Sequence, residues 1–96
     1  MKNRQFRWDT NKFKSNLNKH GISFKEAATV FEDKNAIYFD DYSHSHDEDR
    51  FIIIGCSDQD KLLMVCHCYR DEGDTIRIIS ARRANSTEKE LYGGNL

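Results

Sequence analysis

The sequence has no proline, and it has no apolar run that approaches the roughly 20 residues of a membrane-spanning helix. Residues 1–8 are charged but no apolar segment follows them, so they lack the pattern of a signal peptide. The three cysteines cannot all pair within one chain, and thiols stay reduced in the cytoplasm. We therefore expect a cytoplasmic protein without disulfides. The absence of linkers and repeats predicts a single domain over residues 1–96.

A surplus of positive charge is also missing, since the net charge of the chain is −1. Residues 1–20 hold six Lys and Arg against one acid, whereas residues 21–60 hold three against ten. Proteins that bind nucleic acid are usually basic overall. RNA binding by this chain would therefore have to rest on a local basic site.

Two helices are expected near the start of the chain. Asp9 offers its side chain as the N-cap of a helix over Thr10–Lys19. A second helix, Phe24–Glu32, should begin with a capping box, in which Ser23 and Glu26 satisfy each other's free backbone donors. We expect the Glu26 side chain to be exposed to solvent.

Alternation of polar and apolar side chains predicts the strands. They cover residues 5–8, 36–39, 50–55, 61–70 and 75–82. Asp71–Asp74 reads as a hairpin turn, and a last helix begins near Asn85 and ends at Gly93–Gly94. The order β-α-α-β-β-β-β-α indicates an α+β fold, an antiparallel sheet with two N-terminal helices and one C-terminal helix packed against it.

The strand over residues 75–83 is unusual because it carries three arginines. Strict alternation puts Arg77 and Arg82, five residues apart, on opposite faces, unless a bulge re-aims one of them. Arg70 and Arg50 stand at the ends of neighbouring strands. Guanidinium groups gathered on one surface form a site for phosphate, because each can bind two phosphate oxygens. Equally, arginines at strand ends commonly form salt bridges, and acidic partners are available nearby.

Histidine patterns give weaker indications. His44 and His46 lie among acids, but no CxxC or HExxH spacing is present, so we expect a solvated loop and no metal. His20 ends the first helix, where it could stabilise the helix dipole or transfer a proton. Ser80 has no histidine near it in sequence, which argues against a serine hydrolase. Cys66 and Cys68 point the same way on a strand and are expected to be buried.

These segments resemble the BrnT family of toxins along nearly the whole chain. The first matching elements are Phe6-x-Trp8-Asp9, Lys12, Asn16, Lys19-His20-Gly21 and Ser23-Phe24-x-Glu26-Ala27-x-x-Val30-Phe31. The later ones are Asp40 or Asp41, Glu48-x-Arg50, Ile54-Gly55, Ile76-Arg77-Ile78-Ile79-Ser80-Ala81-Arg82, and Glu88 with Tyr92. Cys66 and His67 depart from the aliphatic or aromatic residues more usual in the family, which leaves the role of His67 open.

The resemblance implies a RelE-like fold and an RNA-cleaving toxin of a type II toxin–antitoxin system that inhibits translation and growth. It implies no cofactor, and a BrnA-like antitoxin with a ribbon-helix-helix domain, through which alone the toxin would contact operator DNA. On this basis we assign residue roles as hypotheses. Arg77 and Arg82 bind phosphate and stabilise charge, Arg50 and Arg70 support them, and His20 or Tyr92 transfers a proton. Lys12 and Lys19 contribute to RNA binding, Glu48 orients Arg50, and Ser80 supports the site.

Other classes of function stay open at this point. The chain could be a module that binds RNA or protein without cutting, for example a degenerate toxin that survives as a co-repressor partner. A metalloenzyme is a more distant alternative.

Overall fold

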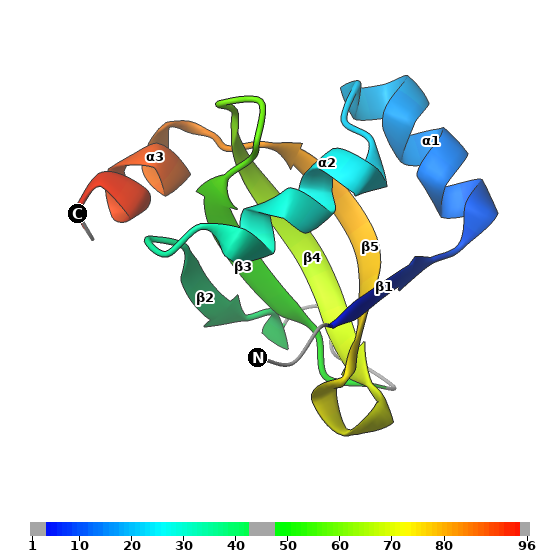
Figure 1. Ribbon diagram of the computed structural model, residues 1–96. Helices are drawn as coiled ribbons and strands as arrows, with labels where there is room; N and C mark the ends of the chain where they lie inside the picture. Colours follow the sequence, from blue (N-terminus) through cyan, green and yellow to red (C-terminus); the bar gives the residue numbers. More distant parts are fainter. Residues whose placement is uncertain (1–3, 43–47, 95–96) are drawn as a thin grey trace.

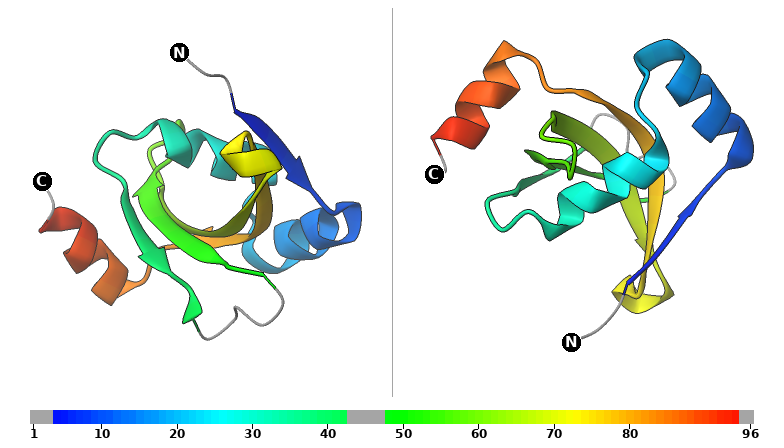
Figure 2. Two further views of the ribbon diagram at one scale, coloured as in Figure 1. Left: turned by 90° about the horizontal axis from the view of Figure 1, so that it is seen from below. Right: turned by 45° about the horizontal axis from the view of Figure 1, so that its top comes forward.

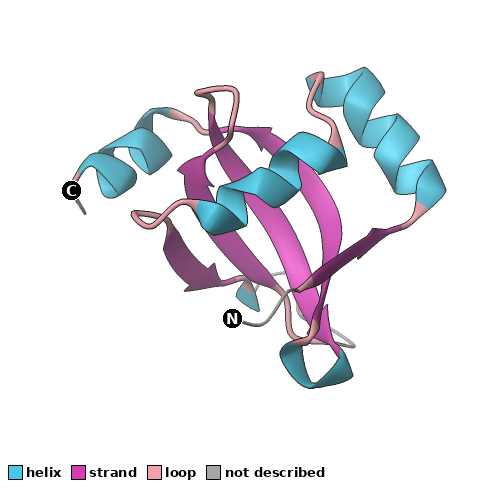
Figure 3. Cartoon of the chain, viewed as in Figure 1, coloured by secondary structure: helices cyan, strands magenta, loops and turns pink. Residues whose placement is uncertain are grey.

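The computed structural model describes residues 4–42 and 48–94. A five-stranded sheet, ordered β1-β5-β4-β3-β2, forms the centre of the molecule (Figure 1). The strands are β1 (Gln5–Trp8), β2 (Ile37–Asp40), β3 (Phe51–Cys56), β4 (Leu62–Arg70) and β5 (Thr75–Arg83). The helices are α1 (Thr10–His20), α2 (Phe24–Thr29), α3 (Ser86–Gly93) and the short 3-10 helices η1 (Val30–Glu32) and η3 (Asp71–Gly73), and Figure 3 shows how they surround the sheet.

The mixed α+β class is confirmed, but the expectation of a purely antiparallel sheet is wrong. Strands β2 to β5 pair antiparallel in chain order, whereas β1 pairs parallel to β5. Hairpin connections oblige neighbouring strands to run antiparallel. β1 is joined to β5 by no hairpin, because the rest of the chain lies between them. Its direction is set by packing at the sheet edge, which alternation within four residues cannot reveal.

The sheet curves around α2, which lies on its concave side (Figure 2). Phe24 and Ala27 of this helix, both fully buried, pack with Ile22 and Val30 against the inner residues of the strands. Those inner residues are Ile53, Leu63, Val65, Ile76, Ile78 and Ala81. Burying a side chain such as Phe24 contributes about 1.5–3 kcal/mol, so this layer is the main source of stability.

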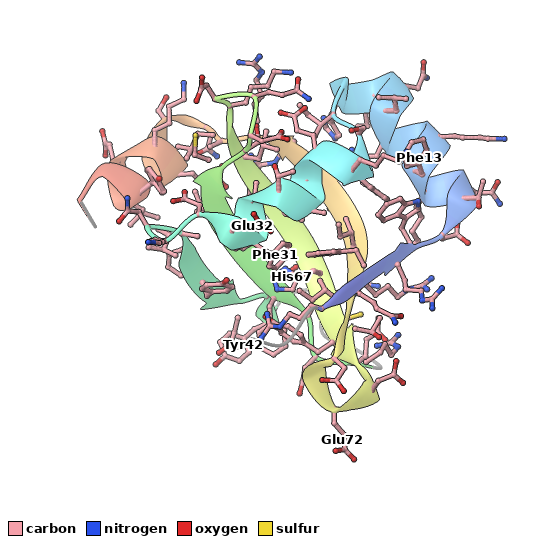
Figure 4. All side chains as sticks on the ribbon, in the orientation of Figure 1. Phe13, Phe31, Glu32, Tyr42, His67 and Glu72 are labelled. Carbon is pink, nitrogen blue, oxygen red and sulfur yellow. The ribbon has the colours of Figure 1, made fainter. Side chains whose placement is uncertain are left out.

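His67 belongs to this core. Its side chain is fully buried, and its ring meets Phe31 edge-on at a centroid distance of 4.8 Å. Figure 4 labels the two residues, which lie next to each other. Nε2 lies 3.2 Å from the hydroxyl of Tyr69, and Nδ1 lies 3.3 Å from the carbonyl of Val65. Burial lowers the pKa of His67 to about 4, so the ring is neutral at physiological pH. The structure therefore places His67 in the core, where its ring packs against aromatic neighbours.

A β-bulge interrupts the pairing of β4 with β5. His67 pairs with Ile78 and Cys66 pairs with Ser80, so Ile79 has no cross-strand partner. Beyond this point the alternation is inverted, and Ala81 joins Ile76 and Ile78 in the core. The expected division of β5 into faces is therefore wrong after residue 79. Arg82 points to the same side of the sheet as Arg77, away from α2.

The predicted helix caps are confirmed for α1 and in part for α2. Asp9 accepts from the backbone of Lys12 and so caps α1, as expected. Ser23 accepts from the Glu26 backbone, but the reciprocal half of the capping box is absent. The Glu26 side chain is buried and accepts from Ser57 Oγ at 2.7 Å, which corrects its expected exposure. The Glu26 carboxylate thus accepts from Ser57, far away in the chain, in place of the Ser23 backbone N–H.

Asn16, the buried polar residue of α1, completes the edge of the sheet. β1 pairs with β5 only as far as Ile78, and Asn16 takes over at Ala81. Its Nδ2 donates to the Ala81 carbonyl at 2.8 Å, and its Oδ1 accepts from the Ala81 N–H at 3.0 Å. The side-chain amide thus forms the two hydrogen bonds that a neighbouring strand would supply.

Candidate functional site

The face of the sheet turned away from α2, here called the convex face, carries most of the arginines selected from the sequence. β1 and β5 are in register at Arg7 and Arg77, and Arg77 lies opposite Cys68 of β4. Continuing the β3–β4 register by one residue places Arg50 on the other side of Cys68. Arg70 follows two residues after Cys68, on the same face. We call these four residues, Arg7, Arg77, Arg50 and Arg70, the arginine row.

Arg70 is held by two neighbours. It forms an ion pair with Glu48, and its Nη1 donates to Cys68 Sγ at 3.2 Å. The hydrogen bond from Arg70 lowers the pKa of Glu48, with a smaller contribution from the charge of Arg50. Glu48, which is predicted to orient Arg50, forms an ion pair with Arg70, which projects over the same face. The acid therefore fixes one member of the row while staying ionised.

Arg77 differs from Arg70 in having no acidic partner among the residues that the structure describes. It is half-buried, and its guanidinium forms no hydrogen bond or ion pair with the residues that the structure describes. Arg7, beside it, donates only to Gln5 Oε1, at 3.1 Å. Two adjacent guanidinium groups are thus left with donors to offer. A phosphate group suits such donors, because its oxygens can accept from two guanidinium groups at once.

Arg82 lies on the convex face but in a different setting. Its two terminal nitrogens donate to the two oxygens of Glu88, at 2.8 and 2.9 Å. Glu88 also accepts from the Asn85 N–H as part of the capping box of α3. The Arg82 hydrogen bond lowers the pKa of Glu88, and Glu88 raises that of Arg82. Arg82 therefore ties α3 to β5. It stands five residues from Arg77, roughly 15 Å along the strand, with half-buried Ser80 between them.

Tyr92 does not reach the arginine row. Its hydroxyl donates to Asp33 Oδ2 at 2.7 Å, and the same oxygen accepts from the Cys56 N–H. The hydrogen bond to Asp33 raises the pKa of Tyr92 to about 12. Cys56 ends β3, whereas Arg50 precedes its start, so Tyr92 and the row lie at opposite ends of the sheet.

Lys12, Lys19 and His20 are exposed on α1, the helix that flanks β5 (Figure 1). None of their side chains forms a hydrogen bond or ion pair within residues 4–42 and 48–94. The structure therefore leaves them beside the sheet without joining them to the arginines. Asn16, which lies between Lys12 and Lys19 in the sequence, hydrogen-bonds directly to Ala81 of β5.

Two cysteines lie beneath the arginines. Cys66 and Cys68 are both buried and share the convex face, as expected from their spacing. Cys66 donates to Asp41 Oδ2 at 3.5 Å, and burial raises the pKa of its thiol to about 12. Burial also raises the pKa of Cys68. Both residues are protonated thiols at neutral pH and are not nucleophiles.

Sequence reasoning missed Arg7. The alternation within residues 5–8 already placed it on the face opposite Phe6 and Trp8, and only the parallel pairing with β5 brings it to Arg77. Asp41, the acceptor of the Cys66 thiol, was noted only as a motif position.

His44 and His46, considered for a metal site, lie outside the described residues. Within the described ranges no cluster of three or more His, Cys, Asp or Glu side chains is arranged to hold a metal ion. No described helix combines the length and the apolar character needed to cross a membrane.

Comparison with known proteins gives this geometry a context. Residues 8–88 match a family model described as "Ribonuclease toxin, BrnT, of type II toxin-antitoxin system". The class is therefore that of the ribonuclease toxins of toxin–antitoxin pairs. The chain belongs to the BrnT family, and the resemblance seen in the sequence is confirmed.

A solved structure has the same fold. The crystal structure of the Brucella abortus ribonuclease toxin BrnT superposes with a TM-score of 0.65 at 22% sequence identity. The match covers 86% of this chain and 99% of that one. At this identity the likeness establishes the fold alone. No match was found among curated protein sequences.

Proposed function

We propose that this chain is an endoribonuclease toxin whose arginine row binds the scissile phosphate of RNA and stabilises the charge that develops during cleavage, without a metal ion. The observation that carries the proposal is the half-buried Arg77 guanidinium, which has no partner among the described residues although its neighbour Arg70 is ion-paired. A partly desolvated cation with free donors favours an anion in the position that a carboxylate would otherwise take.

The chemistry required is a transfer within the RNA backbone. The 2′-oxygen attacks the adjacent phosphorus while its proton passes to solvent water, the bond from phosphorus to the 5′-oxygen breaks, and that oxygen takes a proton from solvent water. The phosphorus centre passes through a crowded, strongly anionic state. Arg77 donates to the non-bridging oxygens in that state, with Arg70, fixed by Glu48, and Arg50 in support.

Arg82 receives a different role in this proposal from the one expected from the sequence. Both of its terminal nitrogens already bind Glu88, so it positions α3 and the end of β5 instead of contacting RNA.

Proton transfer has two candidates from the sequence, His20 and Tyr92. His20 is exposed at the end of α1, and the Tyr92 hydroxyl is engaged with Asp33. Neither contacts the arginine row among the described residues. The proposal therefore places the main contribution to catalysis on charge stabilisation by Arg77, which requires neither of them.

Incubation of the purified protein with end-labelled RNA tests the activity. We expect discrete cleavage products in buffer and in buffer with excess EDTA. Intact RNA in both would overturn the proposal and favour a module that binds without cutting. Loss of cleavage in EDTA alone would retain the ribonuclease and exclude the metal-free mechanism.

The family also implies an antitoxin partner. We propose that this partner is a BrnA-like protein with a ribbon-helix-helix domain, and that the toxin meets operator DNA only through it. We also propose that the toxin has a RelE-like fold and that, when free in the cytoplasm, it inhibits translation. Co-expression with the adjoining reading frame tests this: the partner should co-purify, and its presence should restore growth that the toxin alone arrests. A partner that co-purifies without restoring growth would contradict neutralisation.

A further inference from the structure

We propose that Arg7 of β1 is a second phosphate-binding residue, which holds the same phosphate group of single-stranded RNA as Arg77. The inference rests on the proposed function and deepens it, because it identifies a residue of the site that the family motifs and the sequence reasoning did not select.

The register of the sheet brings the two side chains together. Arg7 and Arg77 are direct partners in the parallel ladder between β1 and β5. Neighbouring strands lie about 4.8 Å apart, and paired residues project from the same face. The preceding and following residues, Phe6 with Ile76 and Trp8 with Ile78, pack on the concave side. Both arginines therefore project from the convex face.

The charges of the pair are uncompensated. Arg7 is exposed and donates to Gln5 Oε1, a neutral amide that orients the guanidinium without neutralising it. Arg77 has no polar side-chain partner within the described residues. Glu48, an acid beside the row, is ion-paired with Arg70. Two like charges side by side oppose each other, and one phosphate between them converts that repulsion into two charge-assisted contacts.

Arg4 shows that this placement is specific to Arg7. It belongs to the same N-terminal segment, three residues earlier, and lies against the ring of Tyr69 with its guanidinium carbon 5.8 Å from the centroid. Tyr69 alternates with Cys68 and points with His67 and Phe51 to the concave side. Arg4 thus carries the same charge, close in sequence, toward the other face. It provides a matched control.

Binding of a single-stranded 2′-O-methyl RNA oligonucleotide, which has no free 2′-hydroxyl and cannot be cleaved, tests the inference. Fluorescence anisotropy over a series of salt concentrations would compare the wild type with Arg7→Gln and Arg4→Gln. We expect Arg7→Gln to weaken binding roughly tenfold at low salt. The slope of log K against log salt should fall by about 0.7 for the lost phosphate contact. Arg4→Gln should stay within about twofold of the wild type, because its guanidinium lies on the other face.

A double variant, Arg7→Gln with Arg77→Gln, tests whether one phosphate is shared. We expect its loss of affinity to be smaller than the product of the single losses, because residues that hold one group are not additive. Equal effects of Arg7→Gln and Arg4→Gln would overturn the inference, as would fully additive losses. Neither result depends on cleavage. A wild type that binds through Arg7 but leaves natural RNA intact would instead contradict the proposed ribonuclease activity and leave the phosphate site standing.

Discussion

The two ends of β5 present the same side chain in opposite circumstances. Arg77 and Arg82 come from one strand and project from one face, yet Arg82 is bound at both terminal nitrogens by Glu88 whereas Arg77 has no acidic partner in the described chain. An arginine whose donors are satisfied by a carboxylate contributes to structure. One whose donors are left open beside another guanidinium is suited to bind a ligand. The two arginines share a residue type and a face, and we expect their different partners to give them different roles.

Of the substitutions at the two ends of β5, replacement of Arg77 should have the largest effect, which we expect on the rate of RNA cleavage. We expect Arg77→Ala to lower the rate of RNA cleavage at least a hundredfold, since removal of one donor to a transition state costs roughly 3 kcal/mol. The free energy of unfolding should hardly change, because Arg77 forms no ion pair within the described part of the chain. Cleavage assays and urea unfolding measure the two quantities. Arg83→Ala, an exposed arginine at the end of the same strand, is the control and should change neither. Cleavage by Arg77→Ala at the wild-type rate would contradict the site.

Arg82→Ala should reverse this pattern. Loss of the bidentate contact removes the positive charge beside Glu88 and leaves the carboxylate with its hydrogen bond from the Asn85 N–H. We expect the free energy of unfolding to fall by about 1–2 kcal/mol, and by the smaller value because the pair is partly exposed. Activity should fall less than tenfold. The double variant with Glu88→Ala should be less destabilised than the sum of the single variants. A variant that is fully stable yet inactive would move Arg82 into the catalytic site.

A fall in pH should reduce the stability contributed by the Glu88–Arg82 pair more than the stability contributed by the Glu48–Arg70 pair, which lies at the Arg77 end. The pKa of Glu88 is lowered in the folded protein by Arg82, so its contribution is present above the unfolded value, about 4.3, and is lost as the pH falls through the folded value. Urea unfolding at about pH 5.5 and about pH 3 should show a smaller loss in Arg82→Ala than in the wild type. Arg70→Ala, which frees the more exposed Glu48, should change that loss less. Equal effects of the two variants would contradict the contrast.

Tyr92→Phe should give the smallest effect. It removes a hydrogen bond to Asp33, which keeps its bond from the Cys56 N–H, so we expect a loss of about 1 kcal/mol or less. Cleavage should remain within about twofold of the wild type, and His20→Gln, at an exposed position, should behave likewise. A hundredfold loss in either variant would restore that residue as the proton-transfer group.

Much of the fold was predictable because its signals are local. The N-cap at Asp9 and the strands from residue 36 onward each depend on residues that are close together in the sequence, so capping chemistry or alternation suffices to find them. The parallel direction of β1 was not predictable in this way. It depends on a strand that lies some 70 positions away in the chain, at Thr75 to Ile78.

The site shows the same division. Arginines could be selected from the sequence by residue type, but the bulge at Ile79 decides which of them share a face, and one unpaired residue is invisible to a rule of strict alternation. Glu26 was assigned to solvent on its local pattern and is instead bound by Ser57, 31 positions later. The position of Arg7 beside Arg77 could be found only from the register between β1 and β5, which the sequence did not reveal.

Asn16 has a consequence beyond the two hydrogen bonds that it forms with Ala81. Past the end of β1, the outer border of β5 would otherwise expose bare backbone groups, the kind of template on which a second chain can add a strand and begin to aggregate. A side-chain amide ends the ladder without offering a new strand to extend it. The helix that flanks the candidate site thus covers this stretch of β5 with a side chain in place of a strand, and so opposes the addition of a further strand at Ala81.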